Sequence, residues 1–307
     1  MKHTDNPWPY VIVVFVLSYL WQLFLYFNGG IDSPLFPIMM LFPGVVAIAF
    51  RMINKEGFRN VGWGLRRWWY ILPALIAPIL FVLVIGWLLT SLNWATLSEE
   101  HFLFRDGMVE IQKIPLVLGN HAQGIAFFAL NFFLSLSVQS LLGSLVTIGE
   151  EFGWRGYLQE KLLRKYGLNA GLILLGVIWG YWHLPIGLMG WNFPNHPVLG
   201  AFILTPLSTI FIGIFLGWLY LRSKSIWIPT LAHASWNLCA TLLLNELVMQ
   251  RDALFLQLAF LVVWSILAGL CLISLNRKKP MLWQSNATGE KGKDRYEANP
   301  AANHEPT

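Results

Sequence analysis

Long stretches without a single Asp, Glu, Lys or Arg are the feature that most restricts how this chain can fold. A predominantly apolar run of about 18 or more residues can cross a bilayer as a helix. Charge-free runs of this length are Trp8–Ile31, Ser33–Phe50, Trp68–Ser98, Ile114–Gly149, Tyr166–Leu221, Ser225–Asn245 and Ala253–Asn276. The run Tyr166–Leu221 is long enough for two spans, separated by the segment GWNFPNHPVLG. The sequence therefore predicts an all-α, polytopic membrane bundle of about eight transmembrane helices.

The composition supports a membrane protein over a soluble one. Only 12% of the residues are charged and 56% are hydrophobic, whereas about 25% of a soluble domain is charged. Cys239 and Cys271 both fall inside predicted spans, so we interpret them as buried packing residues rather than as a disulfide.

The distribution of Lys and Arg predicts the orientation. All but three of the 21 basic residues lie on one side of an eight-span topology, and the exceptions are Arg105, Lys113 and Arg251. Basic residues concentrate on the cytoplasmic side, so we expect both termini to be cytoplasmic, in a membrane that we interpret as the bacterial plasma membrane. The net charge of +5 then reflects topology, and no nucleic-acid partner is expected.

The chain divides into two parts on composition. Residues 1–276 are expected to form a single membrane domain, with a functional core at about residues 120–245. Residues 277–307 are polar and rich in Pro, Asn and Gly, so we expect a disordered cytoplasmic tail.

Polar residues follow one face of the fourth predicted span. Small or polar residues recur every four positions, which places them on one side of a helix; they are Asn131, Ser135, Gln139, Gly143, Thr147 and Glu151. The Ser and Gly members are typical of helix–helix contacts in membranes. A carboxylate at membrane depth needs a partner or water. Arg155 follows Glu151 by four residues and is its natural ion-pair partner, which leaves Glu150 as the candidate for chemistry.

Two further segments supply catalytic side chains. Glu150 and His183 lie at similar distances from the turn at Gly167, so an antiparallel hairpin brings them to one level. His233 and Asn237 share a helical face in the seventh span. A carboxylate, two imidazoles and an amide from three helices suit peptide-bond hydrolysis. The spacing is not that of an HExxH zinc protease.

These motifs resemble the CPBP family, which comprises type-2 CAAX prenyl proteases and Abi-like, bacteriocin-processing relatives. The resemblance rests on three motifs in order: Glu150-Glu151-x-x-x-Arg155, an aromatic-x-x-x-His at Trp179–His183, and His-x-x-x-Asn at His233–Asn237. It covers about residues 120–245. The first residue of the second motif is commonly Phe in the family. We interpret Trp179 in its place as a change in packing that leaves the chemistry intact.

The resemblance implies an intramembrane endopeptidase with a conical cavity open to the cytoplasmic leaflet. Glu150 would activate water with help from His183, while His233 and Asn237 would stabilise the oxyanion. Glu151 and Arg155 would hold the site together. Zinc bound by Glu150, His183 and His233 and a metal-free scheme remain equally open. The expected partners are the lipid bilayer and a membrane-embedded or lipidated peptide, for example a prenylated CAAX sequence.

Two other functions fit the sequence less well. A non-catalytic binding or bacteriocin-immunity factor of the same fold would not need the full set of polar residues that the chain carries. A proton or cation transporter could use Glu150 and the two histidines as an ion path. Many transporters contain an internal repeat, and none is recognisable in this sequence.

Overall fold

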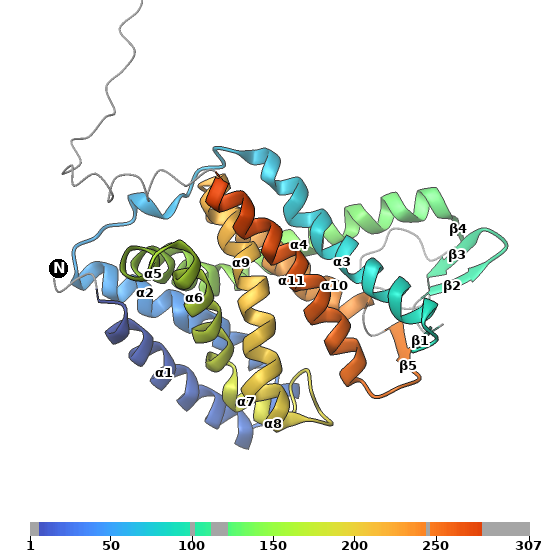
Figure 1. Cartoon of the computed structure of the whole chain (residues 1–307), viewed down its shortest axis with the longest axis horizontal. Helices are drawn as coiled ribbons and strands as arrows, with labels where there is room; N and C mark the ends of the chain where they lie inside the picture. Colours follow the sequence, from blue (N-terminus) through green and yellow to red (C-terminus); the bar gives the residue numbers. More distant parts are fainter. Residues whose placement is uncertain (1–5, 99–101, 112–121, 244–245, 278–307) are drawn as a thin grey trace, which may run out of the picture.

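The computed structural model describes residues 6–98, 102–111, 122–243 and 246–277. It is an elongated bundle of helices with short strands at one end (Figure 1). The helices are α1 (Trp8–Phe27), α2 (Phe42–Ile53), α3 (Ile71–Ser91), α4 (Ile125–Gly153), α5 (Gln159–Tyr166), α6 (Leu168–Trp182), α7 (Leu184–Leu188), α8 (Pro197–Leu199), α9 (Thr205–Ser223), α10 (Trp227–Leu243) and α11 (Leu254–Arg277). A π-helical turn, Trp154–Leu158, joins α4 to α5, and a second one, Gly200–Leu204, joins α8 to α9.

The lengths of the helices support the predicted membrane bundle. In the described part of the chain, six helical stretches are long and apolar enough to cross a membrane: Trp8–Phe27, Phe36–Ile53, Trp68–Ser91, Ile125–Tyr166, Pro197–Ser223 and Leu254–Arg277. Two further predicted spans contain α6 and α10, which have 15 and 17 residues. The helical membrane bundle is confirmed, and the total of eight spans stays a prediction.

Two of the predicted spans extend beyond the helices that they contain. Helix α3 ends at Ser91 rather than near Ser98, because Asn93 adopts a left-handed φ of 55° and the chain then enters a strand. Helix α4 begins at Ile125 rather than at Ile114, and residues 112–121 lie outside the described ranges. A lack of charge permits a segment to be buried or to face lipid, but it does not require that segment to be helical.

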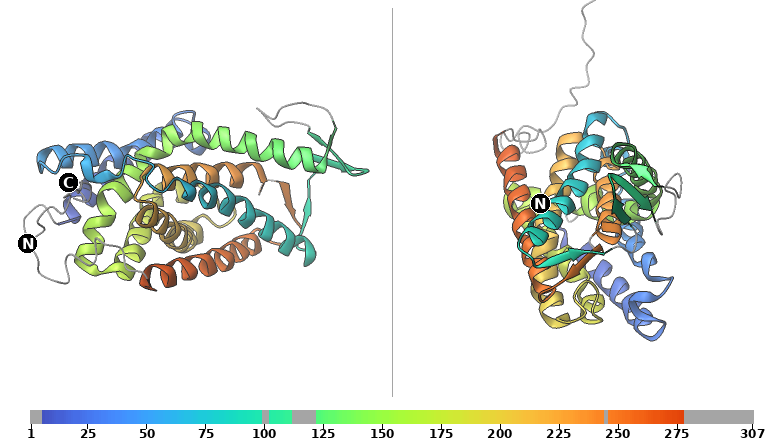
Figure 2. Two further views of the ribbon diagram at one scale, coloured as in Figure 1. Left: turned by 90° about the horizontal axis from the view of Figure 1, so that it is seen from above. Right: turned by 90° about the vertical axis from the view of Figure 1, so that its right-hand side faces the viewer.

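Short strands that the sequence analysis did not predict close the end of the bundle beyond α3 and α4 (Figure 2). Strand β1 (Ala95–Leu97) pairs antiparallel with β5 (Leu247–Met249). Strands β2 (Phe102–Arg105), β3 (Met108–Ile111) and β4 (Gln123–Gly124) form a second antiparallel sheet. The pairing of β1 with β5 joins the segment between α3 and α4 to the segment between α10 and α11.

Basic residues gather at the opposite end of the bundle, which we call the basic end. Here α2, α9 and α11 finish, and α3, α6 and α10 begin. Arg67 Nη1 donates to the backbone oxygen of Arg222 over 2.7 Å, and Trp8 Nε1 donates to the hydroxyl of Tyr166 over 3.2 Å. Arg105 and Arg251 lie at the end that carries the strands. This separation agrees with the predicted topology.

Helix α4 has one exposed apolar face and one buried face. Its exposed apolar side chains are Ile125, Phe127, Leu130, Leu134, Val138, Leu141, Leu142 and Leu145. The predicted polar face is buried or half-buried, and Thr147 Oγ1 donates to the backbone oxygen of Thr230 in α10 over 3.1 Å. From Glu150 to Gln159 every residue is buried. The chain therefore passes from a lipid-facing helix into a fully enclosed segment.

Glycines hold the helices that surround this enclosed segment close together. A Cβ atom on Gly176 of α6 would lie 2.4 Å from the Cα of Ile210 in α9. A Cβ on Gly44 of α2 would lie 2.7 Å from the backbone oxygen of Gly149, directly before the two glutamates. Small residues at such crossings allow two backbones to touch. Helices α4 and α6 are thereby fixed in position on either side of the site.

Candidate active site

Three helical segments bring the predicted residues into one buried cluster. The end of α4 carries Glu150 and Glu151, the end of α6 carries His183, and α10 carries His233. Their exposed fractions are 2%, 0%, 7% and 4%, respectively. Arg155, in the π-helical turn, is 1% exposed. Ionisable residues this deeply enclosed in a membrane protein are costly and commonly functional.

Glu151 is the centre of an ionic group. Its Oε1 accepts hydrogen bonds from Arg155 Nη1 over 2.7 Å and from His233 Nδ1 over 2.9 Å. The ion pair with Arg155 confirms the prediction from the four-residue spacing. The bond from His233 comes from a helix 82 residues further along the chain and was not predicted. Because Nδ1 donates to Glu151, the Nε2 atom of this imidazole remains for another partner.

Glu150 has neutral partners instead of a cation. Its Oε2 accepts from the indole Nε1 of Trp179 over 2.7 Å and from that of Trp154 over 3.3 Å. In the described structure no Lys or Arg forms an ion pair with Glu150, as the sequence analysis predicted, but the carboxylate does not stand alone. The two indoles fix Oε2, and Oε1 makes no hydrogen bond to a described residue.

Trp179 contacts four other residues of the site. Besides its bond to Glu150, its ring lies 4.8 Å from Arg155 Cζ and 5.4 Å from the centroid of the His233 ring. Its backbone oxygen accepts from His183 Nδ1 over 2.8 Å. Trp179 therefore does more than alter the packing, because it also forms a hydrogen bond with Glu150; that it leaves the chemistry intact stays a prediction. A phenyl ring has no N–H group, so Phe at this position could not hold the carboxylate.

Aromatic rings fix His183 in orientation. Its imidazole stacks on Trp191, with centroids 4.9 Å apart and planes at 7°, and meets the edge of Trp182 at 4.6 Å. The Nδ1–H group is directed to the backbone of Trp179, so Nε2 is the ring nitrogen left for chemistry. The sequence analysis predicted no role for Trp182 or Trp191 beside His183, or for Trp154 beside Glu150. Only Trp154 had a signal in the sequence, because it follows Glu150 by four residues, a spacing at which helical side chains meet.

Asn237 lies one helical turn beyond His233 in α10, as predicted, but on an exposed part of the helix. In the described residues its side chain makes no hydrogen bond, and its backbone oxygen accepts from Thr241 Oγ1 over 2.9 Å. The structure thus brings together five of the six predicted residues. The role of Asn237 stays a prediction.

The donor set does not fit a metal held jointly by Glu150, His183 and His233. In the described part of the chain, no three His, Cys, Asp or Glu side chains are placed to hold a metal ion. Glu150 Oε1 and the Nε2 atoms of both histidines make no hydrogen bond to the described residues, but the three side chains do not form a group that could hold one ion. We therefore assign no chemical step to a metal.

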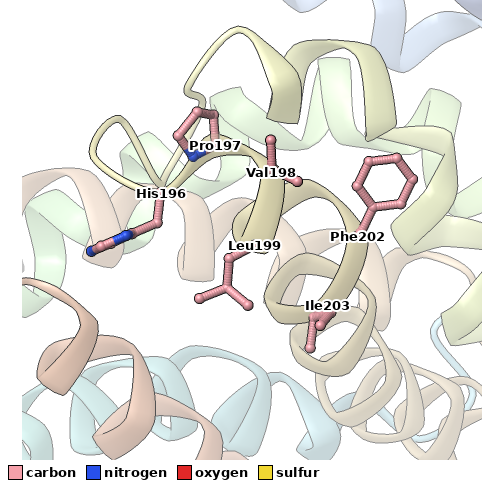
Figure 3. A pocket seen from close by; sticks show the side chains of 6 residues that line it. All are labelled: His196, Pro197, Val198, Leu199, Phe202 and Ile203. Atoms are coloured by element: carbon pink, nitrogen blue, oxygen red, sulfur yellow. The ribbon is translucent and has the colours of Figure 1, made fainter.

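Neither of the two described pockets is lined by this cluster. One, of about 520 Å³, lies at α8 and the π-helical turn that precedes α9 and is largely apolar (Figure 3). Its lining residues are His196, Pro197, Val198, Leu199, Phe202 and Ile203. The other pocket lies at the basic end. The conical cavity expected at the site stays a prediction.

Comparison with known proteins agrees with the three motifs. Residues 131–239 match the family described as Type II CAAX prenyl endopeptidase Rce1-like. CAAX prenyl protease 2 from Methanococcus maripaludis is 30% identical over 123 residues, which cover 38% of this chain and 45% of the relative. The alignment thus spans just under half of that relative. The matched range contains all of the cluster, from the glutamates of α4 to the His-x-x-x-Asn motif of α10. The chain is thus an integral membrane protein that is similar, over residues 131–239, to the Type II CAAX prenyl endopeptidase family.

Proposed function

We propose that this protein is an intramembrane endopeptidase that hydrolyses a peptide bond of a membrane-associated substrate with water activated by Glu150. One observation carries the proposal: Glu150 is buried, fixed through Oε2 by two indole N–H groups and unbonded at Oε1. A general base must be held in position yet keep a lone pair for the proton of the attacking water. Glu150 meets both requirements.

In this mechanism His183, His233 and Asn237 contact the reacting atoms, and Glu151 and Arg155 position them. His183 presents Nε2, which orients the water and helps to pass its proton to the leaving amine. Glu151 accepts from Nδ1 of His233 and so orients the ring, whose Nε2 is directed to the oxyanion of the tetrahedral intermediate and donates to it when it carries a proton. Asn237 adds a second donor from the same face of α10. Arg155 neutralises Glu151 and holds α4 against α10 through it.

We further propose that the substrate is a lipidated, CAAX-type peptide presented from the cytoplasmic side. The family match and the relative named CAAX prenyl protease 2 support this class of substrate. The basic end of the bundle supports the orientation, because Lys and Arg concentrate on the cytoplasmic side of membrane proteins.

The test is a cleavage assay on the detergent-purified full chain. Pairs of peptides with identical C-terminal CAAX sequences, one farnesylated and one with a free cysteine, are incubated with the protein. The masses of the products are then measured by mass spectrometry. We expect hydrolysis of the farnesylated member to release a short C-terminal fragment. Binding of the peptides by folded protein without any cleavage would instead support a non-catalytic membrane factor.

Replacing Trp179 by phenylalanine is expected to lower kcat about 10–100-fold. The change removes one hydrogen bond to a carboxylate, which contributes about 1.5–3 kcal/mol, while the aromatic packing is retained. The measurement is kcat and KM for the cleaved peptide. We expect the loss in kcat, because Trp179 holds the base rather than the substrate.

Trp264→Phe is the matched control. Trp264 is fully buried in an aromatic cluster that contains none of the site residues, and its Nε1 makes no hydrogen bond in the described structure. This variant should therefore keep kcat within a few-fold of wild type. Equal losses in the two variants would show that ring volume matters and the bond to Glu150 does not.

A further inference from the structure

A polar pocket at the basic end contains buried charges that the proposed reaction does not use. It has a volume of about 210 Å³ and lies between the end of α2 and helix α5. We call it the Arg51 pocket, and its lining residues are Arg51, Glu56, Asn60, Tyr157, Glu160, Lys161 and Arg164.

Arg51 is a buried cation without a carboxylate partner in the described structure. It is 4% exposed. Its Nη1 donates to the backbone oxygen of Gly57 over 2.7 Å and its Nη2 to that of Gly156, while Nε has no hydrogen-bond partner. Burying a guanidinium without an anion is costly. The pocket is therefore lined by a positive charge that no carboxylate of the described residues balances.

The remaining charges of the pocket leave a net positive charge. Lys161, which is 8% exposed, pairs with Glu56 over 2.7 Å, and Arg164 pairs with Glu160. Among the described residues that line the pocket, three cations, counting Arg51, therefore face two carboxylates. The hydroxyl of Tyr157 accepts from Asn54 Nδ2 over 3.3 Å, which leaves its own hydrogen to donate. This surplus of one positive charge matches the single negative charge of a phosphodiester.

The pocket also lies where lipid headgroups are expected. Met52 and Ile53, directly after Arg51, have exposed fractions of 67% and 75%. These apolar side chains continue the lipid-facing surface of α2 up to the charged segment that begins at Lys55. A basic pocket between membrane helices on the cytoplasmic side is a common site for anionic headgroups.

We propose that the Arg51 pocket binds the phosphodiester headgroup of an anionic glycerophospholipid. The phosphate oxygens accept from Arg164 and the Tyr157 hydroxyl, beside the Arg51 guanidinium, while the acyl chains lie along the exposed end of α2. Arg51 also bonds to Gly156, in the π-helical turn that contains Trp154 and Arg155. A bound lipid thus stabilises this π-helical turn, whose Trp154 and Arg155 side chains bond to the carboxylates of Glu150 and Glu151.

The experiment uses the full chain in nanodiscs of three kinds: phosphatidylcholine alone, phosphatidylcholine with a minority of phosphatidylglycerol, and phosphatidylcholine with added inorganic phosphate. The thermal unfolding midpoint and the phosphatidylglycerol retained in native mass spectra are measured. We expect phosphatidylglycerol to raise the midpoint and to be retained, and inorganic phosphate to have little effect. Equal stabilisation by inorganic phosphate would overturn the lipid assignment in favour of a free-phosphate site.

Variants distinguish this pocket from general attraction to anionic lipid. Arg51→Gln and Arg164→Gln are each expected to weaken phosphatidylglycerol binding about tenfold, since each removes a positive charge beside the phosphate. Arg164 is half exposed, so its variant folds even if Arg51→Gln does not. Arg66→Gln removes an exposed cation that does not line the pocket and should bind like wild type. Equal binding by Arg164→Gln and Arg66→Gln would overturn the proposal.

Discussion

Replacing Glu150 by glutamine is expected to lower kcat for peptide cleavage about 10³-fold or more, with little change in stability. Glutamine has the same shape, and its carbonyl oxygen can accept from the indoles of Trp179 and Trp154 as the carboxylate oxygen does. It cannot take a proton from water, and general-base catalysis contributes about 10²–10⁴-fold. The measurement is kcat for the farnesylated peptide, with the unfolding midpoint of each sample as a check on folding.

Glu110→Gln is the matched control for this prediction. It makes the same chemical change at an exposed carboxylate in β3, at the opposite end of the bundle. We expect its activity to equal that of wild type. Activity of Glu150→Gln within about tenfold of this control would exclude Glu150 as the base.

Replacing Arg155 by methionine is expected to destabilise the protein by about 3–5 kcal/mol, the usual cost of removing one partner from a buried ion pair. The side chains of Arg155 and Glu151 are both 0% exposed. After the change, Glu151 keeps only its bond to His233 among the contacts of Oε1. The free energy of unfolding is measured by denaturant titration in detergent, and the activity should fall with the loss of site geometry.

The chain offers an ion pair of the same types and spacing for comparison. Arg164 and Glu160 are also four residues apart, but their side chains are 53% and 30% exposed. We expect Arg164→Met to cost no more than about 1 kcal/mol. The double variant Glu151→Gln/Arg155→Met should recover part of the loss, since no unpaired charge remains. If Arg155→Met and Arg164→Met lower the free energy of unfolding by the same amount, burial of the ion pair between Glu151 and Arg155 adds nothing to the stability of the protein.

Features that depend on near neighbours in sequence were predictable. The charge-free runs identified the membrane helices, because the bilayer excludes unpaired charge along a whole span. The four-residue spacing identified the ion pair of Glu151 and Arg155, because side chains at that spacing meet on any helix. The polar face of α4 followed from the same rule.

Contacts between distant segments were not predictable in the same way. The bond from Trp179 to Glu150 joins residues 29 positions apart and depends on how the π-helical turn bends the chain before the α5–α6 hairpin. The pairing of β1 with β5 joins segments on either side of most of the bundle. Neither follows from periodicity, because each requires the helices to be packed first.

The point at which the exposed apolar side chains of α4 stop also bears on the depth of the proposed site in the bilayer. From Ile125 to Leu145 the helix rises about 30 Å, which equals the thickness of a typical hydrocarbon core of about 30 Å. If α4 stands parallel to the membrane normal with this stretch in the hydrocarbon, Glu150 lies about 7 Å further along, at the edge of the hydrocarbon core. A scissile bond a few residues from a lipidated cysteine would therefore reach Glu150 while the lipid chain stays in the hydrocarbon, and the substrate need not unfold into the bilayer centre.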